Sequence, residues 1–304
     1  MSLLTCNNLT KRYGSTLALD GVDLSLEAGA PIALIGPNGA GKTTLFSLLC
    51  GYLRASSGEL KILGQAPGST ALRGRLAALP QDAQLDPRFS VGHQLQLFAR
   101  LQGFSKAAAH KEVMRVLEQV DLAATYSQKP EALSHGMRKR VMLAQALMGS
   151  PELILLDEPT AGLDPPNVKQ MRALIGEAAT QATFIISSHN LDELEKVCQT
   201  VVHLEHGKLK AVVDISQSQA ADAASYLTLI MGRLDQPETM ISQSLASLSG
   251  VKQVSFSAPS RFVIEYDAIN HAGLDLVLLQ HLASQGWVYR QLINGRSLED
   301  QLYF

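Results

Sequence analysis

The sequence predicts an α/β protein with a second, smaller α+β domain, and three observations carry this prediction. Short, unalternating apolar runs at 30–35, 153–156 and 183–186 are typical of strands buried on both faces of a parallel sheet. A glycine-rich turn and a helix-period pattern follow the first run. Beyond residue 220 the apolar patterns predict the order strand, helix, strand, strand, helix, strand, which is that of a ferredoxin-like domain.

The first domain is expected over residues 1–215. Its first core strand is the run 30–35, which leads through the glycine-rich turn into a helix. From about 84 to 150 such strands are absent and apolar residues recur at helical spacing, so we predict a helical insertion. The runs 153–156 and 183–186 then return to the sheet, where they should be neighbours.

A polar stretch rich in Ser, Gln and Ala, residues 216–225, is the expected linker to a second domain over 226–304. Phe262, Ile264 and Tyr266 alternate with polar residues, which indicates a strand with one buried face. The predicted strands are 226–231, 251–257, 261–267 and 287–293, and the predicted helices are 237–248 and the segment from Leu274 to Gly286.

Composition excludes several classes of protein. The 304 residues exceed what one average domain needs, and 26 Lys and Arg against 28 Asp and Glu give no basic field for nucleic acid. Hydrophobic residues make up 46%, yet no window approaches the roughly 18–20 apolar residues that span a bilayer. The first residues turn polar too early for a signal peptide, so we expect a cytoplasmic protein.

The segment 36–43 reads Gly-Pro-Asn-Gly-Ala-Gly-Lys-Thr and fits the phosphate-loop pattern G-x-x-x-x-G-K-[ST] between a strand and a helix. Glycines let backbone N–H groups approach a polyphosphate, and the helix N-terminus adds partial positive charge. We expect Lys42 to reach the β- and γ-phosphates and the Thr43 hydroxyl to ligate Mg²⁺. The predicted nucleotide-binding residues of this loop are Gly36, Asn38, Gly39, Ala40, Gly41, Lys42, Thr43 and Thr44.

Two acidic residues and a histidine end the later strands, at the sheet edge where ligands bind in open α/β folds. We expect Asp157 to hold Mg²⁺, usually through water, and Glu158 to be the general base that deprotonates the attacking water. His189 can meet the γ-phosphate from the same edge. The chain lacks the Asn-Lys-x-Asp segment by which P-loop GTPases read guanine, so ATP is favoured.

Together with the phosphate loop, Gln81 and His189, the run Leu-Ser-His-Gly-Met at 133–137 resembles the signature of the ATP-binding cassette ATPases of ABC transporters. That signature is commonly Leu-Ser-Gly-Gly-Gln, so His135 and Met137 depart from it, in a form similar to drug- and polysaccharide-exporting subunits. His135 either adds a donor near phosphate or faces solvent. The resemblance covers the first domain and implies a P-loop ABC ATPase fold, a RecA-like α/β core with a helical insertion.

The resemblance implies roles for further residues. Ser134 and Gly136 would contact the γ-phosphate bound by the opposite subunit, which suits a hydroxyl and a helix N-terminus. Tyr13 matches the aromatic that stacks on adenine, with an edge-strand aromatic as the alternative. Gln81 matches the glutamine that contacts Mg²⁺ or the attacking water. Asp164 matches a residue that crosses the dimer interface, with a turn-forming Asp before two prolines as the alternative.

The implied activity is ATP hydrolysis that energises a membrane transporter, with ATP and Mg²⁺ bound between two identical subunits. Integral-membrane permease subunits would be the partners, and the chain would sit peripherally at the cytoplasmic face of the cell (inner) membrane. The closing residues 297–304 resemble the Ser-Leu-Glu-(Asp)-x-Phe ending common in exporter ATPases paired with ABC-2-type permeases, which favours export. The alternatives are an importer ATPase and a soluble ABC ATPase outside transport.

Overall fold

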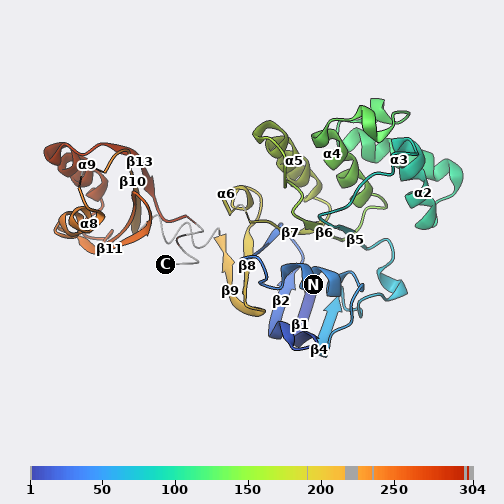
Figure 1. Ribbon diagram of the computed structural model, residues 1–304, viewed down its shortest axis with the longest axis horizontal. Coiled ribbons are helices and arrows are strands. Elements are labelled where there is room, and N and C mark those ends of the chain that lie inside the picture. The colour runs from blue at the N-terminus through green and yellow to red at the C-terminus, as the bar shows by residue number, and fades with distance from the viewer. Residues whose placement is uncertain (1, 190, 216–224, 235, 298–299, 301–304) are drawn as a thin grey trace. The chain divides into compact units, whose positions relative to one another are not determined.

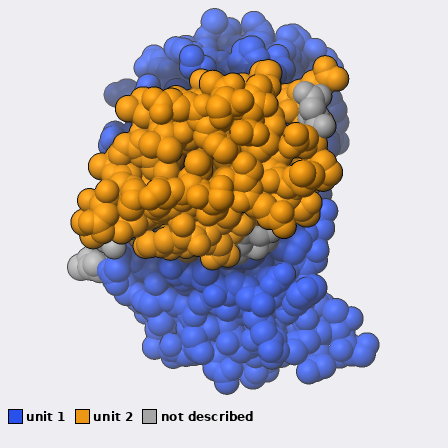
Figure 2. Space-filling model, turned by 90° about the vertical axis from the view of Figure 1, so that its left-hand side faces the viewer, with its two compact units in different colours: residues 1–212 blue, residues 213–304 orange. Residues whose placement is uncertain are grey.

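The computed structural model describes residues 2–189, 191–215, 225–234, 236–297 and 300 (Figure 1). The chain divides into two compact units, residues 1–212 and residues 213–304 (Figure 2). Residues 216–224 of the expected linker lie outside the described residues.

Unit 1 contains a six-stranded sheet in the order β5-β6-β7-β3-β8-β9. The strands are β3 (Ile32–Ile35), β5 (Leu76–Leu79), β6 (Leu153–Asp157), β7 (Thr183–Ser187), β8 (Thr200–Glu205) and β9 (Lys208–Asp214). β3, β6 and β7 are buried along their whole length, and β7 pairs in parallel with both β6 and β3, which confirms the prediction that the runs 153–156 and 183–186 are neighbours. Helix α5 (Pro165–Ala178) connects β6 to β7, and α6 (Leu191–Leu194) follows β7.

A second, antiparallel sheet of unit 1 is formed by β1 (Ser2–Tyr13), β2 (Thr16–Glu27) and β4 (Ser57–Ile62) in the order β2-β1-β4. The sequence does not predict this sheet, because several register shifts in the β1–β2 pairing interrupt the apolar alternation. Buried leucines of β1 and β2 share one core with helix α1 (Lys42–Leu49) and with the strands of the larger sheet. Side chains of both sheets therefore pack on the helix that follows the phosphate loop.

The stretch between β5 and β6 is helical, as predicted. It contains α2 (Val91–Leu101), α3 (Lys106–Gln119) and α4 (His135–Ala146), with short 3₁₀ turns at Ala123–Thr125 and Pro130–Ala132. Ser90, Ser105 and Ser134 precede the three helices, and each Oγ accepts a hydrogen bond from the N–H three residues later. Such N-caps satisfy donors that the first turn of a helix leaves free.

Unit 2 consists of β10 (Tyr226–Met231), α8 (Glu238–Ala246), β11 (Val251–Ala258), β12 (Arg261–Tyr266), α9 (Leu274–Gln285) and β13 (Tyr289–Asn294). Its antiparallel sheet has the order β11-β12-β10-β13, which gives the ferredoxin-like arrangement predicted from the sequence. α9 ends at Gly286, whose φ of 69° is left-handed, as expected for a helix stop. Across the described ranges, no helix combines the length and apolar content that crossing a bilayer requires.

The closing motif of the chain has a structural basis in unit 2. The backbone N–H of Asp300 donates to Ser297 Oγ (3.2 Å), and the N–H of Ser297 donates to Asp300 Oδ2 (3.2 Å), as in a capping box. Asp300 is 1% exposed and also accepts a hydrogen bond from Arg261 Nη2 of β12 at 2.8 Å. Asp300 thus connects Ser297 to Arg261 of the sheet.

Candidate functional site

The phosphate loop connects β3 to α1 in a backbone conformation that requires glycine at two points. Gly36 has a φ of 145°, and a Cβ atom there would lie 2.1 Å from the carbonyl oxygen of Leu204 in β8. Gly41 precedes the first residue of α1 with a φ of 104°, and a Cβ atom there would lie 2.7 Å from the carbonyl oxygen of Ala18. The close approach of backbone to backbone explains both glycines better than flexibility does.

Most of the predicted nucleotide-binding residues surround one cavity of about 320 Å³. Lys42 extends along the loop, where Nζ donates to the carbonyl oxygens of Gly36 (2.6 Å) and Pro37 (3.2 Å). A cation at the N-terminus of a helix suits a polyphosphate, and Lys42 is the first residue of α1. The residues that line the cavity are Thr16, Leu17, Ala18, Asn38, Gly39, Ala40, Gly41, Lys42, Thr43, Thr44, Gln81, Asp157 and Glu158.

Asp157 and Glu158 are held at the end of β6 by Ser187, the last residue of β7. Ser187 Oγ donates to Asp157 Oδ1 and accepts a hydrogen bond of 3.1 Å from the N–H of Glu158. Glu158 has a φ of 50°, which is rare for a residue with a side chain and often marks a functional position. Both acids are nearly buried, with 7% and 9% of their surfaces exposed.

His189 lies beside Glu158 at the edge of the sheet. Its Nδ1 is 3.0 Å from both Oε1 and Oε2 of Glu158. The His189 side chain is 75% exposed while that of Glu158 is 12% exposed. This contact orients the carboxylate. It adds little to stability, because the imidazole is open to solvent.

Cys50 lies next to this acidic site. Burial, and secondarily the Asp157 carboxylate, raise the pKa of its thiol to about 11. The thiol is therefore protonated near neutral pH, and thiolate is the reactive form of cysteine.

Six of the predicted site residues do not line the cavity, namely Tyr13, Gly36, Ser134, Gly136, Asp164 and His189. Ser134 caps α4, and Gly136 is buried in the first turn of the same helix. Asp164 caps α5, where its Oδ1 accepts from the backbone N–H of Asn167 at 3.3 Å. Tyr13 is 46% exposed at the end of β1, which is the central strand of its sheet and not an edge strand.

Residues 19–161 match the family model described as ABC transporter. The Nod factor export ATP-binding protein I of Burkholderia lata is 38% identical over 208 residues, which are 66% of this chain and 67% of that protein. The chain belongs to the ATP-binding subunits of ABC transporters. It is accordingly an ABC ATPase, an enzyme that hydrolyses ATP.

Two further similarities support the ABC ATPase assignment. The linearmycin resistance ATP-binding protein LnrL of Bacillus subtilis is 30% identical over 233 residues, 75% of each chain. Among solved structures, CbiO1 of Clostridium perfringens, described as part of the transporter complex CbiONQ, superposes with a TM-score of 0.65 at 27% identity. That match covers 72% of this chain and 91% of CbiO1.

Sequence reasoning about this ABC ATPase missed several residues of the site. Thr16, Leu17 and Ala18 of β2 line the cavity but carry no motif. Ser187 only ends an apolar run, although its polar side chain at a buried strand end is a weak signal. Lys139 of α4 donates to the backbone oxygen of Gln81 at 3.5 Å, which links the helical insertion to the cavity.

Proposed function

We propose that this ABC ATPase works as a homodimer that energises a membrane exporter, with each nucleotide bound between a phosphate loop and the Ser134–Gly136 segment of the other subunit. The observation that carries this proposal is the distribution of the predicted residues. The cavity has the loop, Asp157, Glu158 and Gln81 around it, whereas Ser134 is exposed at the start of a helix away from it. A hydroxyl at a helix N-terminus is suited to an anion held by a second subunit.

The residues of the cavity also suit Mg²⁺. Thr43 offers a hydroxyl, Asp157 a carboxylate and Gln81 an amide oxygen, and all three line the cavity. Within the described part of the chain, no group of three His, Cys, Asp or Glu side chains could hold a metal by itself. Mg²⁺ is typically held by one or two carboxylates together with substrate phosphates and water, which fits this donor set. When bound it would neutralise charge on the β- and γ-phosphates.

In this proposal each residue of the site has a separate role in binding or hydrolysing ATP. Lys42 releases its loop carbonyls to contact the phosphates, and backbone N–H groups of the loop hold the phosphate oxygens. Glu158 orients the attacking water and accepts its proton, while His189 holds the carboxylate from the solvent side. Tyr13 stacks on the adenine, and Asp164 meets the second subunit.

Two subunits that complete each other's sites predict complementation between inactive variants. Lys42→Ala removes the phosphate contact in its own site, and Ser134→Ala removes the contact that it makes in the partner's site. Each variant alone should hydrolyse ATP poorly, and a mixture should recover activity because mixed dimers contain one intact site. Phosphate release, measured as one variant is titrated with the other, checks this. A mixture no more active than its components would contradict the shared site.

Ser187→Ala should weaken the response to Mg²⁺, because the alanine no longer donates a hydrogen bond to Asp157. We expect the Mg²⁺ concentration for half-maximal hydrolysis to rise by roughly 10-fold, as happens when a group that orients a metal ligand is removed. Thr183→Val is the matched control, because Thr183 is equally buried at the other end of β7 and its Oγ1 accepts from Gly29 N–H at 2.9 Å. An unchanged Mg²⁺ requirement in Ser187→Ala, or an equal rise in the control, would contradict this role.

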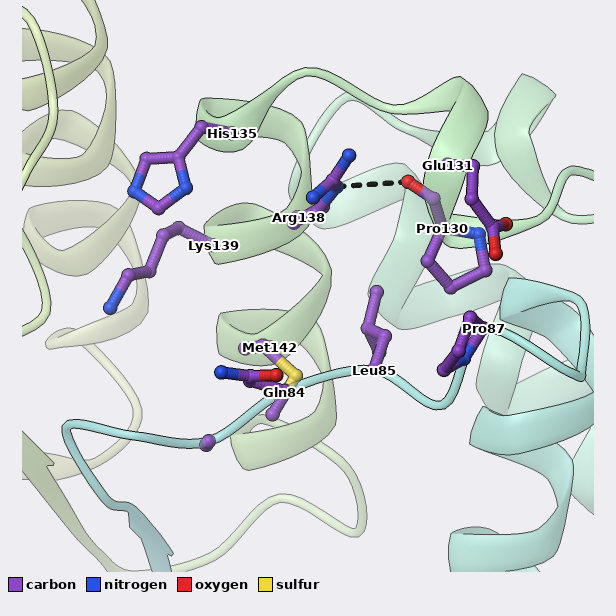
Figure 3. A pocket seen from close by; sticks show the side chains of 10 residues that line it. Gln84, Leu85, Pro87, Pro130, Glu131, His135, Arg138, Lys139 and Met142 are labelled. Atoms are coloured by element: carbon purple, nitrogen blue, oxygen red, sulfur yellow. Dashed lines mark hydrogen bonds between the residues drawn. The ribbon is translucent and has the colours of Figure 1, made fainter.

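A membrane partner has a candidate docking groove beside Gln81. The groove, of about 340 Å³, runs between residues 83–87 and helix α4 (Figure 3). Leu85 and Met142 give it an apolar floor, and Arg138 at its rim donates to the carbonyl oxygen of Pro130 at 2.9 Å. A permease segment seated there would act on Gln81 through the adjoining backbone.

The identity of the membrane partner distinguishes an exporter from an importer or a non-transport ATPase. Relatives named for Nod factor export and linearmycin resistance support export. Tagged chain purified from membranes of its own host should bring with it a polytopic permease and no external solute-binding protein. Recovery of such a binding protein would favour an importer, and recovery of ribosomes would favour a non-transport ATPase.

A further inference from the structure

The first turns of α4 and α5 touch at Gly136. A Cβ atom on Gly136 would lie 2.3 Å from Oδ1 of Asn167 and 2.5 Å from its Cγ. Gly136 does not have a left-handed φ, so backbone freedom does not require glycine there. Glycine is required at this position because the carboxamide of Asn167 occupies the space beside it.

The Asn167 carboxamide is fixed by Asp164. Its Nδ2 donates to Asp164 Oδ1 at 2.5 Å, and the backbone N–H of Asn167 donates to the same oxygen at 3.3 Å. With its amide nitrogen directed at Asp164, the side chain presents its oxygen to Gly136. One residue therefore contacts both the loop that ends in Asp164 and the segment that begins at Ser134.

His135 of α4 also lies near the loop before Asp164. The Nε2 atom of His135 would lie 3.5 Å from a Cβ atom on Gly162, in the loop before Asp164. His135 and Lys139 project from one side of α4, opposite to Arg138 (Figure 3). The histidine that departs from the family signature thus lies near this loop within the same subunit.

We propose that Asn167 is a positioning residue that couples Asp164 to Ser134 and Gly136, so that one subunit presents both segments to its neighbour as a single unit. This inference rests on the proposed dimer, in which both segments face the second nucleotide. It assigns the requirement for glycine at 136 to the Asn167 carboxamide in addition to any phosphate. A change in the space beside Gly136 would then alter the contact with Asp164, because the same carboxamide makes both contacts.

A double-mutant cycle tests the coupling. Gly136→Ala pushes Asn167 away from Asp164, and we expect kcat for ATP to fall by about 10-fold or more, since small displacements at such sites are costly. KM for ATP should change less than kcat, because most of the nucleotide would be held in the cavity around the phosphate loop, which neither residue lines within its own subunit. Asn167→Ala alone should cost a few-fold, and Gly136→Ala in the Asn167→Ala background should cost almost nothing further.

Unit 2 and α5 supply matched controls. Asn270 makes the same local contact, with its Nδ2 donating to Asp267 Oδ2 at 2.7 Å, so Asn270→Ala should leave kcat unchanged. Gly176 of α5 has no atom near an added Cβ, so Gly176→Ala should be neutral. A double variant whose loss in kcat equals the product of the single losses would overturn the proposal.

Thermal unfolding without nucleotide separates this inference from the proposed dimer. If Asn167 fills the space beside Gly136, the same cycle must show non-additive changes in Tm whatever the oligomeric state. Additive Tm values would overturn the contact, and coupled Tm values with uncoupled kcat values would overturn the positioning role. Failure of the Lys42→Ala and Ser134→Ala mixture would instead overturn the dimer and leave the Tm result standing.

Discussion

Glu158→Gln is expected to bind ATP like the wild-type chain and to lose hydrolysis by about 10²–10⁴-fold. The glutamine has nearly the same shape, so the cavity around the phosphate loop is preserved. Its amide cannot accept the proton of the attacking water, and only one oxygen remains to face His189 Nδ1, which contacts both carboxylate oxygens at 3.0 Å. Phosphate release at saturating ATP and direct ATP binding are the measurements.

The same variant should accumulate as an ATP-bound dimer, because the step that would separate the subunits no longer occurs. Size-exclusion chromatography with and without ATP shows this directly. Glu152→Gln is the control, since Glu152 lies just before the same strand and pairs with Arg75 far from the cavity. Wild-type phosphate release by Glu158→Gln would exclude Glu158 as the base. A monomer at all ATP concentrations would argue against ATP-driven dimerisation.

The predictability of each strand follows from how its residues are buried. β3, β6 and β7 are continuous apolar runs because both faces of their sheet are covered, and such runs are visible in a single sequence. β8 is equally internal but carries a buried His203 in its run. β1 includes Asn8 with a left-handed φ, and the alternation of apolar and polar side chains is lost there. The antiparallel sheet of unit 1 therefore cannot be recognised from a two-residue period in the sequence.

Site residues were predictable where a local motif or a strand end marks them. The phosphate loop, Asp157 and Glu158 combine motif and strand end, and the structure brings them to one cavity. Ser187 and Asn167 act through contacts between segments far apart in the chain, and no local pattern distinguishes them from a strand terminus or a helix turn. Their roles therefore depend on the fold, which a single sequence does not display.

Gly36→Ala should be the most damaging small substitution in unit 1. The added Cβ would lie 2.1 Å from the backbone oxygen of Leu204 and 2.9 Å from Ala40 Cβ, and it would sit on a residue with a φ of 145°. The backbone oxygen of Leu204 cannot easily rotate away, since Leu204 directly follows the residues of β8 that pair with β3. Overpacking and backbone strain together should cost about 3 kcal/mol or more.

A loss of that size should lower the Tm of unit 1 by about 10 °C and abolish measurable ATP binding. Binding fails because any relief of the contact moves the loop whose N–H groups hold the phosphates. Gly103→Ala is the matched control, with a φ of 101° but open space around the added Cβ, and should cost only about 1 kcal/mol. If both variants melt and bind alike, the glycine at 36 serves backbone conformation alone. The contact between β8 and the loop would then not be what fixes the phosphate site.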